Sequence, residues 1–200
     1  MKIAIISGSH RKNSESDRVA AYIHKVCSSQ KIASEIISLA GNPLPLWDEG
    51  VWSGADLWKE KWHPIAEKLR SAHGFVVISP EWAGMVPPAL KNFFLLCSTE
   101  EVGHKPALIV SVSSGVGGSY PVAELRNSSY KNNRIVYLPE HVIVRDVTAM
   151  LKGDAPNGKF DEDTRNRIGY GVTLLEEYAK ALAHVRESGV INHTDFPYGL

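Results

Sequence analysis

The 200-residue sequence has few cysteines, no surplus of either charge and no long apolar run. Its two cysteines, Cys27 and Cys97, belong to no CxxC pair, so we interpret both as reduced thiols of an intracellular protein. The charges of the 22 basic and 22 acidic residues cancel, whereas binding to nucleic acid or to an anionic membrane requires a surplus of basic residues. The apolar stretch at residues 1–6 is too short for a signal-peptide core, and no run approaches the roughly 20 apolar residues of a membrane helix. These absences predict a cytoplasmic protein that binds neither nucleic acid nor membrane.

Three ligand-binding motifs are also missing. The chain contains neither the GxGxxG fingerprint of a dinucleotide fold nor the GK[ST] of a P-loop, which weighs strongly against a dinucleotide-binding dehydrogenase. Its eight histidines show no HxxH or HExxH spacing, so we predict no metal site.

Apolar, β-branched runs alternate with segments of helical periodicity along the chain. We predict strands at residues 2–6, 34–39, 74–79, 107–113 and within 135–147, the last interrupted near Pro139. We predict helices at residues 17–29, 56–72, 87–97, 118–127 and 164–187. This alternation predicts an α/β fold with a five-stranded parallel sheet and helices on both faces. No repeat or linker divides the chain, so we expect one domain over residues 1–200.

The loop after the first predicted strand, residues 7–16, suits a phosphate. Open α/β sheets bind ligands beyond the carboxyl ends of their strands, and this loop lies there. It offers several hydroxyls, Arg11 and a new helix N-terminus, whose free N–H groups and partial positive charge attract anions. Without pyrophosphate or triphosphate motifs, a terminal monophosphate fits best. His10 is the one histidine placed to touch it. Taken alone, the same residues are explained equally well as an ordinary strand-to-helix turn with a capping serine and a surface arginine.

The loops after the third and fourth predicted strands suit a planar ring. Trp82 supplies an aromatic face, and Gly84 allows close approach of the backbone. Residues 113–119 contain three glycines, which leave backbone donors open to stabilise negative charge that develops on a reduced ring. Each loop also has a simpler interpretation: Trp82 as a core or interface aromatic, and residues 113–119 as a flexible loop without a role.

The three loops together resemble a known family. Residues 8–14, 80–92 and 115–118 are similar, in order and spacing, to the NADPH-dependent FMN reductase family, which includes flavin, quinone, chromate and azo reductases. The resemblance covers about residues 2–147. It implies a flavodoxin-like three-layer sandwich of strand order 2-1-3-4-5, bound FMN, NADPH or NADH as hydride donor, and a homodimer or homotetramer.

The resemblance also implies which residues bind FMN. Those expected at the phosphate are Ser9, Arg11, Ser14 and Ser16. Those expected along the isoalloxazine ring are Pro80, Glu81, Trp82, Ala83 and Gly84. Those expected at its other edge are Ser113, Gly115, Gly117 and Gly118.

Four positions depart from the family pattern. The family usually has an apolar residue at His10, and often Asn, Tyr and Asn at Ser16, Trp82 and Ala83. The last two departures could change which second substrate fits over the flavin. The cofactor performs the hydride step, so we assign no catalytic side chain.

The predicted function is therefore an FMN-dependent NAD(P)H oxidoreductase that passes electrons to a small acceptor such as a flavin or quinone. Two alternatives stay open. A flavodoxin-type carrier would bind FMN without NAD(P)H turnover, although such carriers are typically acidic and this chain is neutral. A flavin-sensing or scaffold protein would show no turnover at all. We predict structural or interface roles for Lys91 and Asn92, and a packed thiol at Cys97.

Overall fold

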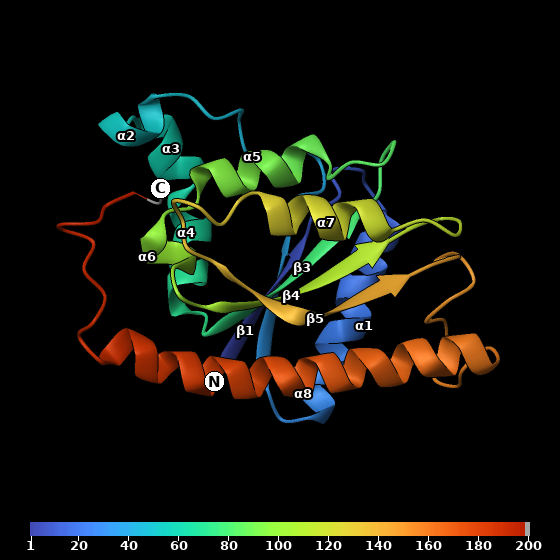
Figure 1. Cartoon of the computed structure of the whole chain (residues 1–200). Helices are drawn as coiled ribbons and strands as arrows, with labels where there is room; N and C mark the ends of the chain where they lie inside the picture. Colours follow the sequence, from blue (N-terminus) through green and yellow to red (C-terminus); the bar gives the residue numbers. More distant parts are fainter. Residues whose placement is uncertain (199–200) are drawn as a thin grey trace.

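A five-stranded parallel sheet of order β2-β1-β3-β4-β5 forms the centre of the molecule (Figure 1). The computed structural model describes residues 1–198. The strands are β1 (Lys2–Ser7), β2 (Ala33–Ser38), β3 (Gly74–Pro80), β4 (Pro106–Val112) and β5 (Val136–Val144). All four pairings are parallel, so the predicted architecture and strand order are confirmed.

The three central strands explain why the sequence shows continuous apolar runs rather than alternation. Every residue of β3 and β4 is buried, and so is β1 after Lys2. A strand covered on both faces has no polar side to display. The core accordingly has two parts, one on each face of the sheet.

Helices cover the two faces of the sheet. On one face lie α1 (Glu15–Ser29) and the long α8 (Lys159–Glu187), which runs below the sheet in Figure 1. The other face is covered by α4 (His63–Ser71), α5 (Pro88–Leu96) and α7 (Ser119–Asn127). Three short helices complete the chain: α2 (Gly50–Ser53), α3 (Asp56–Lys61) and α6 (Thr99–Val102). None of the helices within residues 1–198 has the length and apolarity of a membrane span.

The helix predicted over residues 56–72 is wrong as a single element. The chain forms α3 and then α4, with the break at Trp62. Pro64 has no N–H to continue the ladder of α3, but it is tolerated in the first turn of a new helix. Trp58 and Trp62 are both buried on the sheet side of this break, which shows why the apolar spacing continues across it.

The interruption predicted near Pro139 is present as an irregularity within β5. Ala107 pairs with Tyr137 and Ile109 pairs with His141, so β5 advances four residues while β4 advances two. The two extra residues form a bulge around Pro139 on an outer strand of the sheet, where a residue without an N–H is tolerated.

Candidate functional site

The carboxyl ends of β1, β3, β4 and β5 surround a cavity of about 330 Å³. Seven of the residues predicted at the flavin line it: Ser9, Arg11, Ser14, Ser16, Pro80, Glu81 and Trp82. Six further residues also line it: Asn13, Glu15, Val112, Ser114, Val147 and Thr148. The cavity therefore joins the first and second predicted loops, and it adds a loop after β5 that the sequence did not indicate.

The end of this cavity that is predicted to hold a phosphate is built by the N-terminus of α1. Ser14 caps the helix, because its hydroxyl accepts a hydrogen bond from the Asp17 amide at 3.1 Å. Nearby, the Ser9 hydroxyl accepts from the Arg11 amide at 3.3 Å. Glu15 and Ser16, the first two residues of this 15-residue helix, line the cavity, and the amides at the start of a helix have no partner within it.

Charge at this end favours an anion. Glu15 would repel a phosphate, but its carboxylate lies 2.6 Å from the Arg18 guanidinium and is thereby paired. Arg11 forms no ion pair with any of the described residues, so its guanidinium is available to a ligand. A helix N-terminus, a free arginine and several hydroxyls make a donor set that fits a phosphate monoester.

The second loop is a tight turn. Trp82 and Met85 exchange two backbone hydrogen bonds, of 3.0 and 2.9 Å, across Ala83 and Gly84. Both central residues have positive φ, 50° and 74°, as in the turn that joins two antiparallel strands. This geometry explains why the family often has Asn at position 83, since Asn tolerates the left-handed region better than Ala.

His10, which was predicted to touch the phosphate, does not line this cavity. Its ring packs edge to face against Trp82, with centroids 4.4 Å apart, and it lines a separate cavity of about 470 Å³ next to Pro88. The Nδ1 atom of His10 is buried without a hydrogen-bond partner among residues 1–198.

The third loop is joined to the second through Glu81. The Glu81 carboxylate accepts a hydrogen bond from the Gly118 amide. A Cβ at Gly117 would lie 2.3 Å from Oε2 of Glu81, and a Cβ at Gly118, where φ is 103°, would lie 2.4 Å from Ile143. A Cβ at Gly117 would therefore displace the Glu81 carboxylate, and at Gly118 the positive φ disfavours any other residue as well. Ser113, Gly115, Gly117 and Gly118 do not line the cavity, whereas their neighbours Val112 and Ser114 do.

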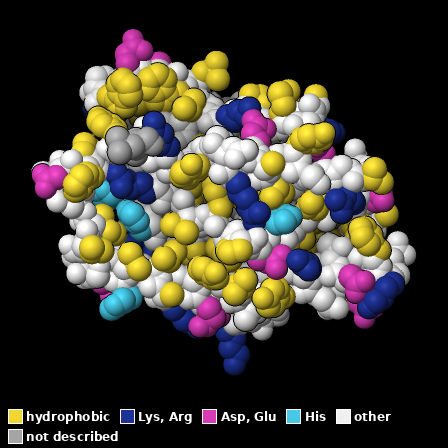
Figure 2. Space-filling model, viewed as in Figure 1, with side chains coloured by type: hydrophobic (Ala, Val, Ile, Leu, Met, Phe, Trp, Pro, Cys, Tyr) yellow, Lys and Arg dark blue, Asp and Glu magenta, His cyan; other side chains and the backbone are white. Residues whose placement is uncertain are grey.

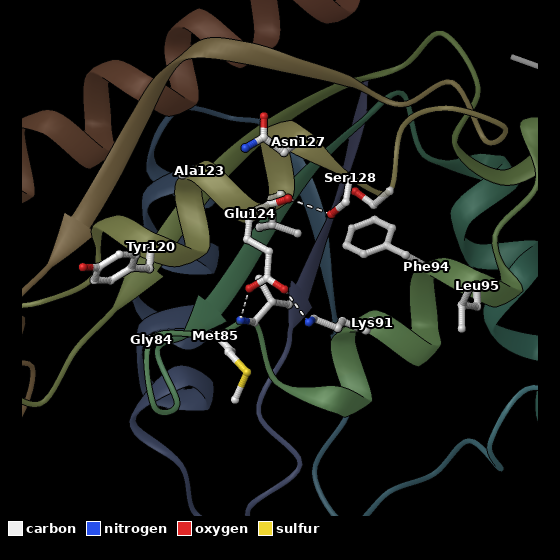
Figure 3. A pocket seen from close by; sticks show the side chains of 13 residues that line it. Gly84, Met85, Lys91, Phe94, Leu95, Tyr120, Ala123, Glu124, Asn127 and Ser128 are labelled. Atoms are coloured by element: carbon white, nitrogen blue, oxygen red, sulfur yellow. Dashed lines mark hydrogen bonds and ion pairs between the residues drawn. The ribbon is translucent and has the colours of Figure 1, made fainter. Parts of the chain in front are cut away.

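Ala83 and Gly84 also lie away from this cavity. Gly84 borders a larger, apolar hollow of about 710 Å³ between α5 and α7 (Figure 3). The side chains of Met85, Leu95 and Tyr120 line this hollow and are 52%, 65% and 68% exposed.

An ion pair lies within the hollow. Glu124 pairs with Lys91 and accepts a 2.6 Å hydrogen bond from the Val86 amide, as the dashed lines in Figure 3 show. Partial burial raises the pKa of Glu124, but these contacts outweigh it and hold the pKa below its usual value. Lys91 thus links α5 to α7 and supports the turn after Trp82.

The other two residues to which we assigned structural roles also make internal contacts. The Asn92 side chain accepts from the Trp47 amide at 2.8 Å and donates to the Pro45 carbonyl at 2.7 Å. The Cys97 thiol donates to the Phe93 carbonyl at 3.3 Å, and burial raises its pKa well above the usual value. Within residues 1–198 no group of three or more His, Cys, Asp or Glu side chains is arranged to hold a metal ion.

Hydrophobic side chains gather at a second place on the surface. Figure 2 shows them over α2 and α3, where Leu46, Trp52 and Leu57 are exposed. Trp52 packs edge to face on Trp47, with centroids 4.9 Å apart. Of the tryptophans in residues 47–62, Trp58 and Trp62 therefore belong to the core and Trp52 to the surface.

A parallel sheet of order 2-1-3-4-5 with helices on both faces is the flavodoxin-like fold, which binds ligands beyond the carboxyl ends of β1 and β3. The sequence model described as "NADPH-dependent FMN reductase" matches residues 1–149. The chain belongs to this family, and it is an NAD(P)H-dependent oxidoreductase that uses FMN.

Individual relatives agree with this assignment. The chain is 26% identical over 187 residues to an NADPH azoreductase of Bacillus sp. (strain OY1-2), covering 94% of this chain and 97% of the relative. It is 29% identical over 127 residues to an FMN-dependent NADPH-azoreductase of Staphylococcus aureus, covering 63% of this chain and 68% of the relative.

Among solved structures, FerB, a flavoenzyme NAD(P)H:(acceptor) oxidoreductase from Paracoccus denitrificans, superposes with a TM-score of 0.71 at 21% identity. The match covers 88% of this chain and 98% of FerB. A flavodoxin from the domain Archaea superposes with a TM-score of 0.53 at 12% identity, covering 89% of this chain and 99% of the flavodoxin. At these identities the likeness concerns the fold.

Proposed function

We propose that the cavity beyond β1, β3 and β4 holds FMN, with the phosphate on the N-terminus of α1. The observation that carries this proposal is the pairing of Glu15 with Arg18, because it leaves Arg11 and the helix amides as uncompensated positive charge at the α1 end of a cavity of about 330 Å³. Bound there, FMN supplies the two-electron chemistry that links NADPH or NADH to a small acceptor. The acceptor class is a quinone, a free flavin or an azo compound, the last supported by the azoreductase relatives.

Three groups of residues have different tasks in this proposal. Those that bind the phosphate are Ser9, Arg11, Ser14 and Ser16. Those that border the ring are Pro80, Glu81, Trp82, Ala83 and Gly84, with Ser113, Gly115, Gly117 and Gly118 at the other edge. Glu81 acts by holding the third loop through the Gly118 amide, which fixes the backbone donors of that loop.

We further propose that residues 1–200 form one domain and that the chain works as a homodimer or homotetramer. The hollow between α5 and α7 supports the oligomer, because it is apolar, exposes Met85, Leu95 and Tyr120, and begins at the turn proposed to border the flavin. Large exposed apolar areas of this kind mark interaction surfaces.

Absorption spectroscopy of the purified protein tests the cofactor. A yellow preparation that releases FMN on denaturation is expected. A colourless protein that also fails to take up added FMN would refute the proposed site.

Anaerobic stopped-flow measurements test the turnover. NADPH or NADH should bleach the bound flavin, and a quinone or an azo dye should restore the colour. If neither nucleotide bleaches the flavin on a timescale of seconds, the flavodoxin-type carrier becomes the better description.

A further inference from the structure

The turn after β5, residues 146–149, forms a fourth wall of the proposed FMN cavity. Val147 and Thr148 line the cavity together with residues of the loops after β1 and β3. The turn is joined to the third loop by two backbone hydrogen bonds, from the Asp146 amide to Gly115 at 3.0 Å and from the Val147 amide to Ser113 at 3.1 Å. The Thr148 side chain makes no hydrogen bond to any of the described residues, so its hydroxyl is free to bind a ligand.

Buried side chains hold this wall from below. Val147, Met150 and Leu151 are 2%, 4% and 5% exposed and pack into the core beneath the sheet, whereas Thr148 and Ala149 are exposed. Thr148 therefore projects from a fixed turn rather than from a loose loop.

Arg18 clamps the same turn to α1. Its guanidinium donates to the carbonyls of Val147, Met150 (2.8 Å) and Leu151 (3.1 Å), while Nε donates to Glu15. Arg18 is one helical turn beyond Ser14, the cap that opens α1 at the cavity. A single side chain thus connects the phosphate end of the cavity with its fourth wall.

Asp161 of α8 fixes the far end of the turn. It is fully buried, and its carboxylate accepts from the amides of Leu151 and Asn157, each at 2.8 Å, and from Arg165 at 3.0 Å. The family match ends at residue 149, so Asp161 and Arg165 lie in a part of the chain outside it.

We propose that Thr148 is a further FMN ligand, whose hydroxyl donates to a phosphate or ribityl oxygen, and that Arg18 and Asp161 are positioning residues that hold it there. This inference rests on the FMN site proposed above. Under this proposal Asp161, which lies outside the part of the chain matched by the family, helps the protein to retain FMN.

Thr148→Val tests the ligand, because it removes the hydroxyl and keeps the shape of an exposed side chain. Thr148→Ser is the matched control that keeps the hydroxyl. Titration of the apoprotein with FMN and with riboflavin, followed by flavin fluorescence, gives both Kd values. We expect Thr148→Val to weaken FMN binding about tenfold, the effect of one hydrogen bond to a charged group, and Thr148→Ser to match the wild type.

The comparison with riboflavin, which lacks the phosphate, identifies the oxygen to which Thr148 donates. A loss confined to FMN assigns the phosphate, and an equal loss for riboflavin assigns the ribityl chain. A Thr148→Val protein with wild-type Kd for both flavins overturns the proposal. Failure of the wild-type apoprotein to bind FMN would instead refute the underlying site.

Arg18→Lys tests the positioning role, because it keeps the charge but cannot reach three carbonyls at once. We expect Arg18→Lys to raise the Kd for FMN about tenfold. Combined with Thr148→Val, it should raise the Kd no further than the more damaging single substitution does, because both act through one contact. Arg70→Lys, on α4 and paired with Glu67, is the control and should leave the Kd unchanged. Fully additive losses in the double variant, with unaltered melting of the apoprotein, would overturn a role through Thr148.

Discussion

His10 and Trp82 pack edge to face, with ring centroids 4.4 Å apart and ring planes inclined by 61°. One partner lines the proposed FMN cavity and the other lines the neighbouring one, so the pair forms a shared wall. This arrangement replaces the expectation that His10 touches the phosphate. His10 instead supports the aromatic side chain that we place beside the ring.

The first prediction follows from this pair. In His10→Leu an apolar side chain still packs on Trp82, so the Kd for FMN should stay within about threefold of wild type. Trp82→Ala removes the aromatic face and should weaken FMN and riboflavin alike. Fluorescence titration with both flavins measures the effects. If His10→Leu lost affinity for FMN but not for riboflavin, this would indicate that His10 contacts the phosphate after all.

The second prediction concerns the third loop. Gly118→Ala places a Cβ at a φ of 103° and 2.4 Å from Ile143, so it should destabilise the protein by roughly 2 kcal/mol or more. Gly115→Ala is the matched control, since no atom lies within 4 Å of its added Cβ, and it should change stability by less than about 0.5 kcal/mol. Urea unfolding gives both values. Equal stability of the two variants would contradict the described loop geometry.

The third prediction concerns Ala83, whose φ of 50° is unfavourable for an alanine. Ala83→Asn should stabilise the protein by about 0.5 kcal/mol, because Asn tolerates this conformation better. Ala83→Val should destabilise it by more than about 1 kcal/mol, because a branched Cβ tolerates this conformation worst. Thermal unfolding ranks the three proteins, and the order Asn, Ala, Val is the expected result.

The fourth prediction is a pH dependence at Asp161. Burial raises the pKa of this carboxyl, but the amides of Asn157 and Leu151 and the Arg165 guanidinium outweigh burial and hold the pKa below its usual value. A lowered carboxyl pKa stabilises the fold above about pH 4, the pKa of an unfolded aspartate, and this contribution is lost as the pH falls through the folded value.

Asp161→Asn measures that contribution. It should destabilise the protein by about 3 kcal/mol at pH 7, because it leaves the largely buried Arg165 without its partner. The difference in the free energy of unfolding between variant and wild type should become smaller below pH 4. Denaturant unfolding at pH 7 and pH 3 tests this, and an equal gap at both values would show that Asp161 does not titrate with a lowered pKa.

The fifth prediction concerns the hollow between α5 and α7. Leu95 is 65% exposed there, so Leu95→Glu places a charge in the proposed subunit interface without disturbing the core. Light scattering after size exclusion should show the wild type as a dimer or tetramer and the variant as a smaller species. Lys25→Glu, on α1 of the opposite face, is a control that should leave the mass unchanged. A monomeric wild type would refute the interface.

The fold was largely predictable because continuous apolar runs mark its central strands clearly in the sequence. Runs such as residues 75–78 are apolar throughout, and such runs alternate along the chain with segments of helical periodicity. The split between α3 and α4 was missed because apolar spacing continues past Trp62, although Pro64 signalled it. The short α6 was missed too, although Ser98 and Glu101 form a capping box that the sequence displays.

The site was predictable where a loop has unusual composition and not elsewhere. The loop after β5 carries no glycine cluster or aromatic residue, so nothing local marked Thr148, although the end of β5 lies at the same edge of the sheet. The hydrogen bonds from Arg18 to the segment after β5 join residues more than 125 positions apart, and the hydrogen bond between Glu81 and Gly118 joins residues 37 positions apart. Such pairs depend on how the helices pack, which periodicity does not specify.

The bulge in β5 has a consequence for how copies of this chain meet one another. β5 is an outer strand, and an outer strand offers unpaired backbone groups to which a neighbouring chain can add. The slipped register between Tyr137 and His141, together with the missing N–H of Pro139, breaks that row midway along the strand. This edge therefore offers no continuous template, which disfavours the addition of another strand along β5.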